Sequence, residues 1–162
     1  MTFIAVNRKT VRKAWASRLA TNIAGSGKPA QVVYDYQKAD FDAVVPAGTE
    51  VPDTRVVVVT SDGTEGDPLL TGAAASVFLL THIFVLYARG SWTEENSEDA
   101  IDDISQAVIS QAILDADRRE EDEPEWLRIT EMQRSEVDSV MIEGLEYRHE
   151  AIALTFDVGN SA

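Results

Sequence analysis

The chain has 162 residues, with 28 acidic and 14 basic side chains, so its formal net charge is −14. A surface this acidic repels nucleic-acid phosphates and anionic membranes, which argues against nucleic-acid binding and membrane association as its main function. The length fits a single domain over residues 1–162 with a frayed tail. The absence of cysteine excludes disulfides, thiolate metal sites and cysteine nucleophiles. Because no signal-peptide pattern is visible either, we expect a protein made in a reducing cytoplasm.

The basic residues gather at the beginning of the chain. Residues 1–28 carry six basic side chains and no acid, so the other 134 residues carry 8 basic against 28 acidic side chains. This division suits a subunit whose unlike surfaces meet in an assembly, and it also suits a monomer with a basic first helix. The six are Arg8, Lys9, Arg12, Lys13, Arg18 and Lys28.

A helix is predicted over residues 7–24, with Asn7 as its N-cap, because an apolar side chain recurs at every fourth position. The segment GSGKP (residues 25–29) is expected to end this helix. It is not interpreted as a phosphate-binding loop, because such a loop follows a strand and precedes a helix, with wider glycine spacing. The apolar stripe consists of Val11, Trp15, Leu19 and Ile23, widened by Ala14.

Three strands are predicted next, over residues 31–37, 55–60 and 73–89. The second contains four consecutive valines, and the third is apolar at both odd and even positions, so both should be covered on both faces. We therefore place the third strand in the middle of a sheet. His82 lies on one of its apolar faces and is interpreted as a core residue whose hydrogen bonds are satisfied.

Residues 61–72 (SDGTEGDPLLTG) are expected to form the loop between the second and third strands, because they are rich in glycine and aspartate. Asp62, Glu65 and Asp67 are interpreted as solvated loop acids, since their spacing does not match a calcium-binding loop.

A second helix is predicted from an N-cap at Asn96 or Ser97 to about residue 116, and a charged loop over residues 117–125 follows it. Asp102 and Asp103 are expected on its solvated side. Its buried face should comprise Ile101, Ile104, Val108 and Ala112, broadened by Ala107, Ile109 and Ile113.

Two closing strands are predicted over residues 126–134 and 147–158, joined by a partly extended connection. Arg148 and Glu150 continue the apolar face of the last strand in polar residues, so this strand should begin outside the core and enter it near Ala151. His149 is expected to be exposed. Short links between consecutive strands imply antiparallel pairing. The predicted fold is therefore α+β, with one mainly antiparallel sheet of about five strands and two main helices packed on it.

The sequence carries no catalytic signature. It contains no GxSxG, no HExxH and no Rossmann fingerprint. We therefore expect a binding or assembly protein that is not an enzyme, with no catalytic residue, metal ligand or cofactor.

Four segments together resemble the tail terminator family of tailed bacteriophages, which includes the phage lambda minor tail protein U and its relatives in gene transfer agents. The likeness covers nearly the whole chain and depends on the order and character of the elements. The segments are the basic opening helix VRKAWASRLA, the strands VVYDY and RVVVVTSDG, the long strand ending in YARG and leading into SEDAIDDISQAVISQAIL, and the closing pair WLRITEMQRSEVDSVMIEGLEYRHEAIALTFDV.

The resemblance implies a structural virion protein, assembled in the host cytoplasm, that forms a homo-hexameric ring on the finished tail tube. Its partners would be further copies of itself, the major tail tube protein and a head-tail connector or head-closure protein. Double-stranded DNA would pass through the ring without specific binding. We expect the contacts to involve the basic helix, the two acidic loops and the segment after the long strand. These interface candidates are Arg8, Lys9, Arg12, Lys13, Asp62, Glu65, Asp67, Arg89, Trp92, Arg118 and Arg119.

Three alternatives stay open at this point. One is another neck, connector or tail-completion protein, which belongs to the same class. A second is a small metal-dependent hydrolase that uses acids such as Asp62 and Asp67, and a third is a monomeric adaptor domain.

Overall fold

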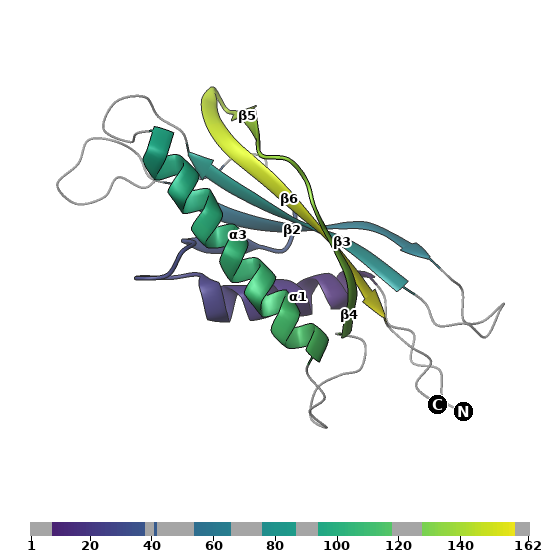
Figure 1. Ribbon diagram of the computed structural model, residues 1–162. Helices are drawn as coiled ribbons and strands as arrows, with labels where there is room; N and C mark the ends of the chain where they lie inside the picture. The colour runs from purple at the N-terminus through teal and green to yellow at the C-terminus, as the bar shows by residue number, and fades with distance from the viewer. Residues whose placement is uncertain are drawn as a thin grey trace, which may run out of the picture.

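One sheet, with two helices packed on one of its faces, makes up the described part of the protein (Figure 1). The computed structural model describes residues 8–37, 41, 54–65, 76–86, 94–117 and 128–157. The strand order is β1-β2-β3-β6-β4, and β5 also pairs with β6. The elements are α1 (Arg8–Ile23), β1 (Val32–Tyr34), β2 (Arg55–Glu65), β3 (Ser76–Leu86), α3 (Glu94–Asp117), β4 (Arg128–Arg134), β5 (Asp138–Ile142) and β6 (Leu145–Asp157).

The predicted α+β class is confirmed, and β3 lies in the interior of the sheet as expected. A sixth strand, β5, occupies the connection before the last strand. It forms a hairpin with β6, in which Ile142 pairs with Leu145. The two residues of this turn, Glu143 and Gly144, have φ angles of 51° and 78°. Two consecutive positive φ values are typical of a type I′ turn, whose twist matches that of the flanking strands.

The prediction of a loop over residues 61–72 was wrong for residues 61–65. Strand β2 continues through Glu65 and pairs with β3, with a register shift between Ser61 and Gly63. The Asp62-Gly63 pair therefore accompanies a bulge inside a strand. The Asp62-Gly63 pair forms a bulge rather than a turn, because β2 pairs with β3 on both sides of the bulge.

The pairing of β1 with β2 is parallel, which differs from the predicted antiparallel order. Val32 lies opposite Val56 and Tyr34 lies opposite Val58. Parallel neighbours need a connection of a dozen or more residues. The segment between Tyr34 and Arg55 is long enough to supply it.

The end of α1 was predicted correctly and the beginning of α3 was not. After Ile23, the chain reverses through Gly25 and Gly27, which have φ angles of 126° and 75°. The N–H of Ala30 then donates to the Ile23 carbonyl at 3.0 Å. Helix α3 already begins at Glu94, so Asn96 and Ser97 lie inside its first turn and do not cap it.

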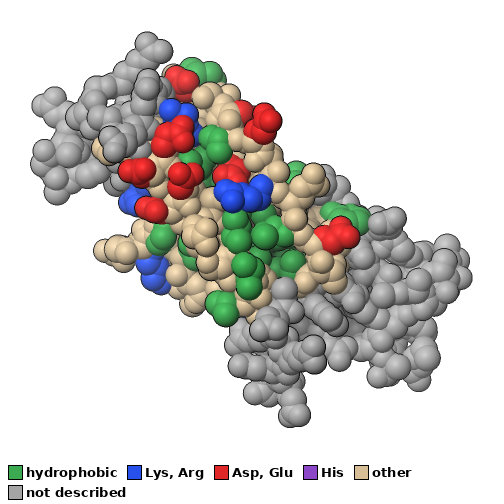
Figure 2. All heavy atoms as spheres, in the orientation of Figure 1, with side chains coloured by type: hydrophobic (Ala, Val, Ile, Leu, Met, Phe, Trp, Pro, Cys, Tyr) green, Lys and Arg blue, Asp and Glu red, His purple; other side chains and the backbone are tan. Residues whose placement is uncertain are grey.

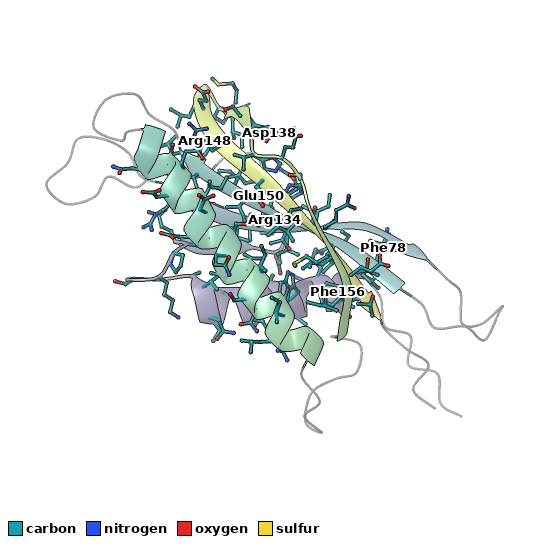
Figure 3. The ribbon with its side chains drawn as sticks, viewed as in Figure 1. Phe78, Arg134, Asp138, Arg148, Glu150 and Phe156 are labelled. Atoms are coloured by element: carbon teal, nitrogen blue, oxygen red, sulfur yellow. The ribbon has the colours of Figure 1, made fainter. Side chains whose placement is uncertain are left out.

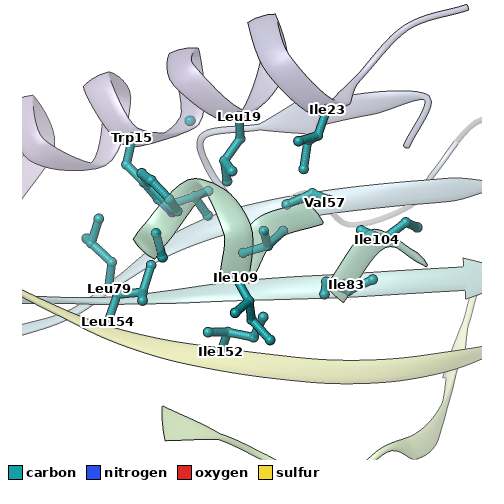
Figure 4. Packing of buried hydrophobic residues seen from close by; sticks show 14 of the residues in the cluster. Trp15, Leu19, Ile23, Val57, Leu79, Ile83, Ile104, Ile109, Ile152 and Leu154 are labelled. Atoms are coloured by element: carbon teal, nitrogen blue, oxygen red, sulfur yellow. The ribbon is translucent and has the colours of Figure 1, made fainter. Parts of the chain in front are cut away.

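The larger hydrophobic core lies between the two helices and the sheet (Figure 4). Trp15 is fully buried and donates from Nε1 to Thr81 Oγ1 on β3 at 3.0 Å. Its ring meets that of Phe156 edge to face, with centroids 5.8 Å apart. The predicted stripe of α1 and the four central apolar residues of α3 are all buried here. Ile113 was predicted to be buried and is 58% exposed, because it lies beside the buried stripe rather than on it.

A smaller core lies on the opposite face of the sheet. Phe41 packs against Phe84 and Tyr147, with ring centroids 5.1 and 5.6 Å apart. Val56 and Val58 complete this cluster from β2, and Leu86 completes it from β3. Since β3 contributes to both cores, the prediction that it is covered on both faces is confirmed for its later half.

The bond between Trp15 and Thr81 should be measurable in stability. We expect Thr81→Val to lower the free energy of unfolding by about 1–3 kcal/mol, because it leaves the buried indole N–H without an acceptor. Combining it with Trp15→Phe should cost less than the sum of the two single changes. Urea denaturation measures all three, and Thr155→Val serves as the control. Strictly additive losses would contradict the bond.

Candidate functional site

Four of the predicted interface residues lie on α1 and form its basic surface: Arg8, Lys9, Arg12 and Lys13. Arg8 and Lys9 are exposed on the first turn of the helix. Arg12 and Lys13 also make contacts within the chain: Arg12 donates from an Nη atom to Ser61 Oγ at 3.0 Å, and Lys13 Nζ lies 2.8 Å from Asp35 Oδ2. The first two side chains are therefore the more accessible part of this surface.

The other predicted interface residues are only partly placed. Asp62 and Glu65 belong to β2, so their backbone is in the sheet. The remaining five, which are Asp67, Arg89, Trp92, Arg118 and Arg119, lie outside the described residues.

An acidic surface covers the N-terminal half of α3. Figure 2 shows carboxylate side chains gathered over this half of the helix, and hydrophobic side chains over the middle of the view. Asp102 and Asp103 are exposed, as predicted, and so are Glu98 and Asp99.

The basic and acidic surfaces lie at opposite ends of the strands. Arg12 on α1 reaches Ser61, which pairs with Leu79 near the beginning of β3. Glu98 on α3 lies 3.0 Å from Arg148, which pairs with Val85 near the end of β3. Figure 1 shows the same arrangement: both helices lie on one face of the sheet, and α3 begins at the upper left whereas α1 begins toward the right. Among the described residues, the basic start of α1 and the acidic N-terminal half of α3 therefore lie toward opposite ends of the strands.

Glu150 is a buried acid that the sequence pattern placed outside the core. It is 1% exposed and lies on the helix-covered face of β6. Its Oε1 accepts from Arg134 Nε at 2.7 Å and from Ser105 Oγ at 3.1 Å (Figure 3). The hydrogen bond to Glu150 raises the pKa of the Arg134 guanidinium above its usual range. The Arg134–Glu150 pair joins β4 to β6, and Ser105 joins both residues to α3. Only the strand register could have revealed this contact.

A chain of four polar side chains crosses the other face of the sheet. Asp138 Oδ1 lies 2.8 Å from His149 Nδ1, and His149 Nε2 lies 2.9 Å from His82 Nδ1. His82 Nε2 lies 3.1 Å from Thr60 Oγ1. The prediction that His82 has its hydrogen bonds satisfied is confirmed, although it is half-buried. His149 was predicted to be exposed, and its side chain is only 15% exposed because it packs against Phe84.

A groove of about 660 Å³ separates the segment after α1 from α3. Lys28 and Asp103 line it from the two sides, so its walls carry both charges. Within the described ranges, no group of three or more His, Asp or Glu side chains is placed to hold a metal ion. In the same ranges, neither helix combines the length and hydrophobicity that a membrane span requires.

The Arg134 contact should contribute to stability. We expect Arg134→Met to lower the free energy of unfolding by about 1–3 kcal/mol, because the Glu150 carboxylate then keeps only Ser105 as a partner. Adding Glu150→Gln should recover part of that loss. Lys9→Met is the matched control, since it removes one exposed positive charge. Equal losses in Arg134→Met and Lys9→Met, measured by urea denaturation, would refute this role.

The Lys13–Asp35 pair predicts a pH dependence. The hydrogen bond from Lys13 lowers the pKa of Asp35 in the folded protein. The stability that this pair contributes is therefore present above the pKa of about 4 that Asp35 has in the unfolded chain. It is lost as the pH falls through the lower pKa of the folded protein. Lys13→Met should cost about 0.2–1 kcal/mol at neutral pH, because the pair is partly exposed. Denaturation at a series of pH values should show this difference vanishing in acid. A constant difference would contradict the linkage.

Comparison with known proteins adds no assignment: no protein-family model matches the chain, and no curated protein matches it.

Proposed function

We propose that this protein is a tail terminator, a structural virion component that closes into a homo-hexameric ring on the tail tube. The ring stops tube polymerisation and joins the tail to the head connector. The observation that carries the proposal is the separation of charge between α1 and α3. Exposed Arg8 and Lys9 lie toward one end of the strands, and exposed Asp102 and Asp103 belong to the acidic surface toward the other.

Charge separated in this way supports a head-to-tail interface. When two different surfaces of one subunit meet, the contact is heterologous, and it generates a ring if the rotation closes. The basic surface of one copy would face the acidic surface of the next, so that every contact in the ring is the same. Complementary charge of this kind mainly fixes partner choice and register.

The order of elements also supports the proposal. A basic helix, two early strands, a long central strand, an acidic helix and closing strands follow one another along the chain. This is the order on which the resemblance to tail terminators depends. The α+β sheet gives such a subunit a rigid frame, and contacts on such frames are usually made by its ends and loops.

The acidic balance of the chain fits passage of DNA through the proposed ring. A net charge of −14 repels a phosphate backbone, so DNA would slide through the opening without binding. The ring would meet the tube protein on one side and the connector on the other, as part of a virion assembled in the host cytoplasm.

Charge reversal tests the proposal directly. In native mass spectrometry, the unmodified protein should form rings of about six subunits, because the complementary charged surfaces attract each other. Reversing two charges with Arg8→Glu and Lys9→Glu should shift the population to monomers. Adding Asp102→Lys and Asp103→Lys to that variant should restore rings.

Arg18→Glu is the control, since it also reverses a positive charge on α1 but lies outside the basic surface. A strict monomer at every concentration, with and without tube protein, would refute the ring. Rings that persist after reversal of Arg8 and Lys9 would refute the role of α1. Tube length measured by electron microscopy with added protein then tests termination itself.

A further inference from the structure

We propose that Thr60 is a base-activated nucleophile, able to accept an acyl group from a small activated ester. The proposal is independent of ring formation. It rests on the chain of Thr60, His82, His149 and Asp138 across the sheet face opposite the two helices. A hydroxyl within hydrogen-bond reach of a histidine, which is itself oriented by further groups, is the arrangement that activates nucleophiles in enzymes.

The direction of the hydrogen bonds follows from the acid at one end. The ionised carboxylate of Asp138 can only accept, so His149 carries its proton on Nδ1. In a neutral imidazole, His149 Nε2 is then an acceptor, and His82 must donate to it from Nδ1. His82 Nε2 is left as an acceptor, and the Thr60 hydroxyl donates to it. Every hydrogen bond in the chain is therefore donated in the direction of Asp138. His82 presents an unprotonated Nε2 to Thr60, which is the tautomer that a general base requires.

The ring geometry favours a shared proton over a bound metal ion. The His82 and His149 centroids are 5.2 Å apart and their planes differ by 24°, while the bonded nitrogens are 2.9 Å apart. These values mean that the two rings meet edge to edge, with the nitrogens on the line between their centres. A tetrahedral metal would need the two lone pairs to converge at an angle. A hydrogen bond needs the N–H of one ring to point straight at the lone pair of the other.

The strand register explains how four strands build the chain. Asp138 lies directly opposite His149, which is diagonal to His82 across β6 and β3. Thr60 is likewise diagonal to His82 across β2 and β3. Ala151 is the residue opposite His82, so a small side chain lies beside the base. Thr60 is half-buried, and its direct neighbour Leu80 offers an apolar contact for the body of a small ester.

The proposed step is an acyl transfer. Thr60 Oγ attacks the carbonyl carbon of the ester while His82 Nε2 takes the hydroxyl proton. The ester C–O bond then breaks, the leaving alcohol takes that proton from His82, and the acyl group remains on Thr60. His149 and Asp138 act as positioning residues, since they set the tautomer of the base without touching the ester.

Acetylation by p-nitrophenyl acetate, followed by peptide mass spectrometry, tests this assignment. We expect a stable acetyl ester on Thr60, retained in Thr60→Ser and absent from Thr60→Val. His82→Gln should slow its formation by about 100-fold or more, the usual contribution of a general base. Thr155→Val is the matched control, because Thr155 is a half-buried threonine on the same face without a histidine partner.

Asp138→Asn tests the positioning role with little risk to the fold, since the Asp138 side chain is 61% exposed. The amide can donate to His149 and so reverse the tautomers along the chain, which should slow acetylation while the circular dichroism spectrum stays unchanged. Acetyl groups found only on lysines, or Thr60 modified no faster than Thr155, would overturn the proposal. An unchanged rate in folded His82→Gln would overturn it as well.

Discussion

The fold depends on one constraint, which is that β3 is apolar on both of its faces. Such a strand cannot lie at an edge or face water on one side, so the sheet must continue on both sides of it and both of its faces must be covered. Leu79 and Ile83 are covered by the helices, and Phe84 and Leu86 are covered by the aromatic cluster around Phe41. Toward its beginning the second face carries Leu80 and His82 instead, and this half-buried part is where the polar chain lies.

The two faces therefore serve different purposes. The helix-covered face is a hydrophobic core in which Glu150 is the one buried charged side chain among the described residues, and Arg134 and Ser105 bind it. The opposite face holds imidazoles in hydrogen bonds near solvent. Neither face depends on the charged residues of α1 and α3. The proposal of ring assembly and the proposal of acyl transfer at Thr60 are therefore independent of each other.

Periodicity along the chain predicted the elements whose burial repeats regularly. Val11, Trp15 and Leu19 define α1 by their spacing, and the α+β class followed from the order of such segments. Periodicity does not report register, and register decides which polar residues meet. Glu150 looked external because its neighbours in sequence are polar, yet Arg134 on β4 and Ser105 on α3 enclose it. The bulge in β2 was missed because Asp-Gly is a turn signal unless a partner strand overrides it.

The pairing pattern of β6 has a consequence for the order in which the protein folds. This strand binds β3 on one side and both β4 and β5 on the other. Its contact with β5 is local, closed by the two-residue turn at Glu143 and Gly144, and such hairpins form within microseconds. Its contact with β3 spans the whole of α3 and must overcome the entropy of closing a long loop. We expect the hairpin to form early and its docking onto β3 to limit the rate, so that the central strand is the last to be covered on both edges.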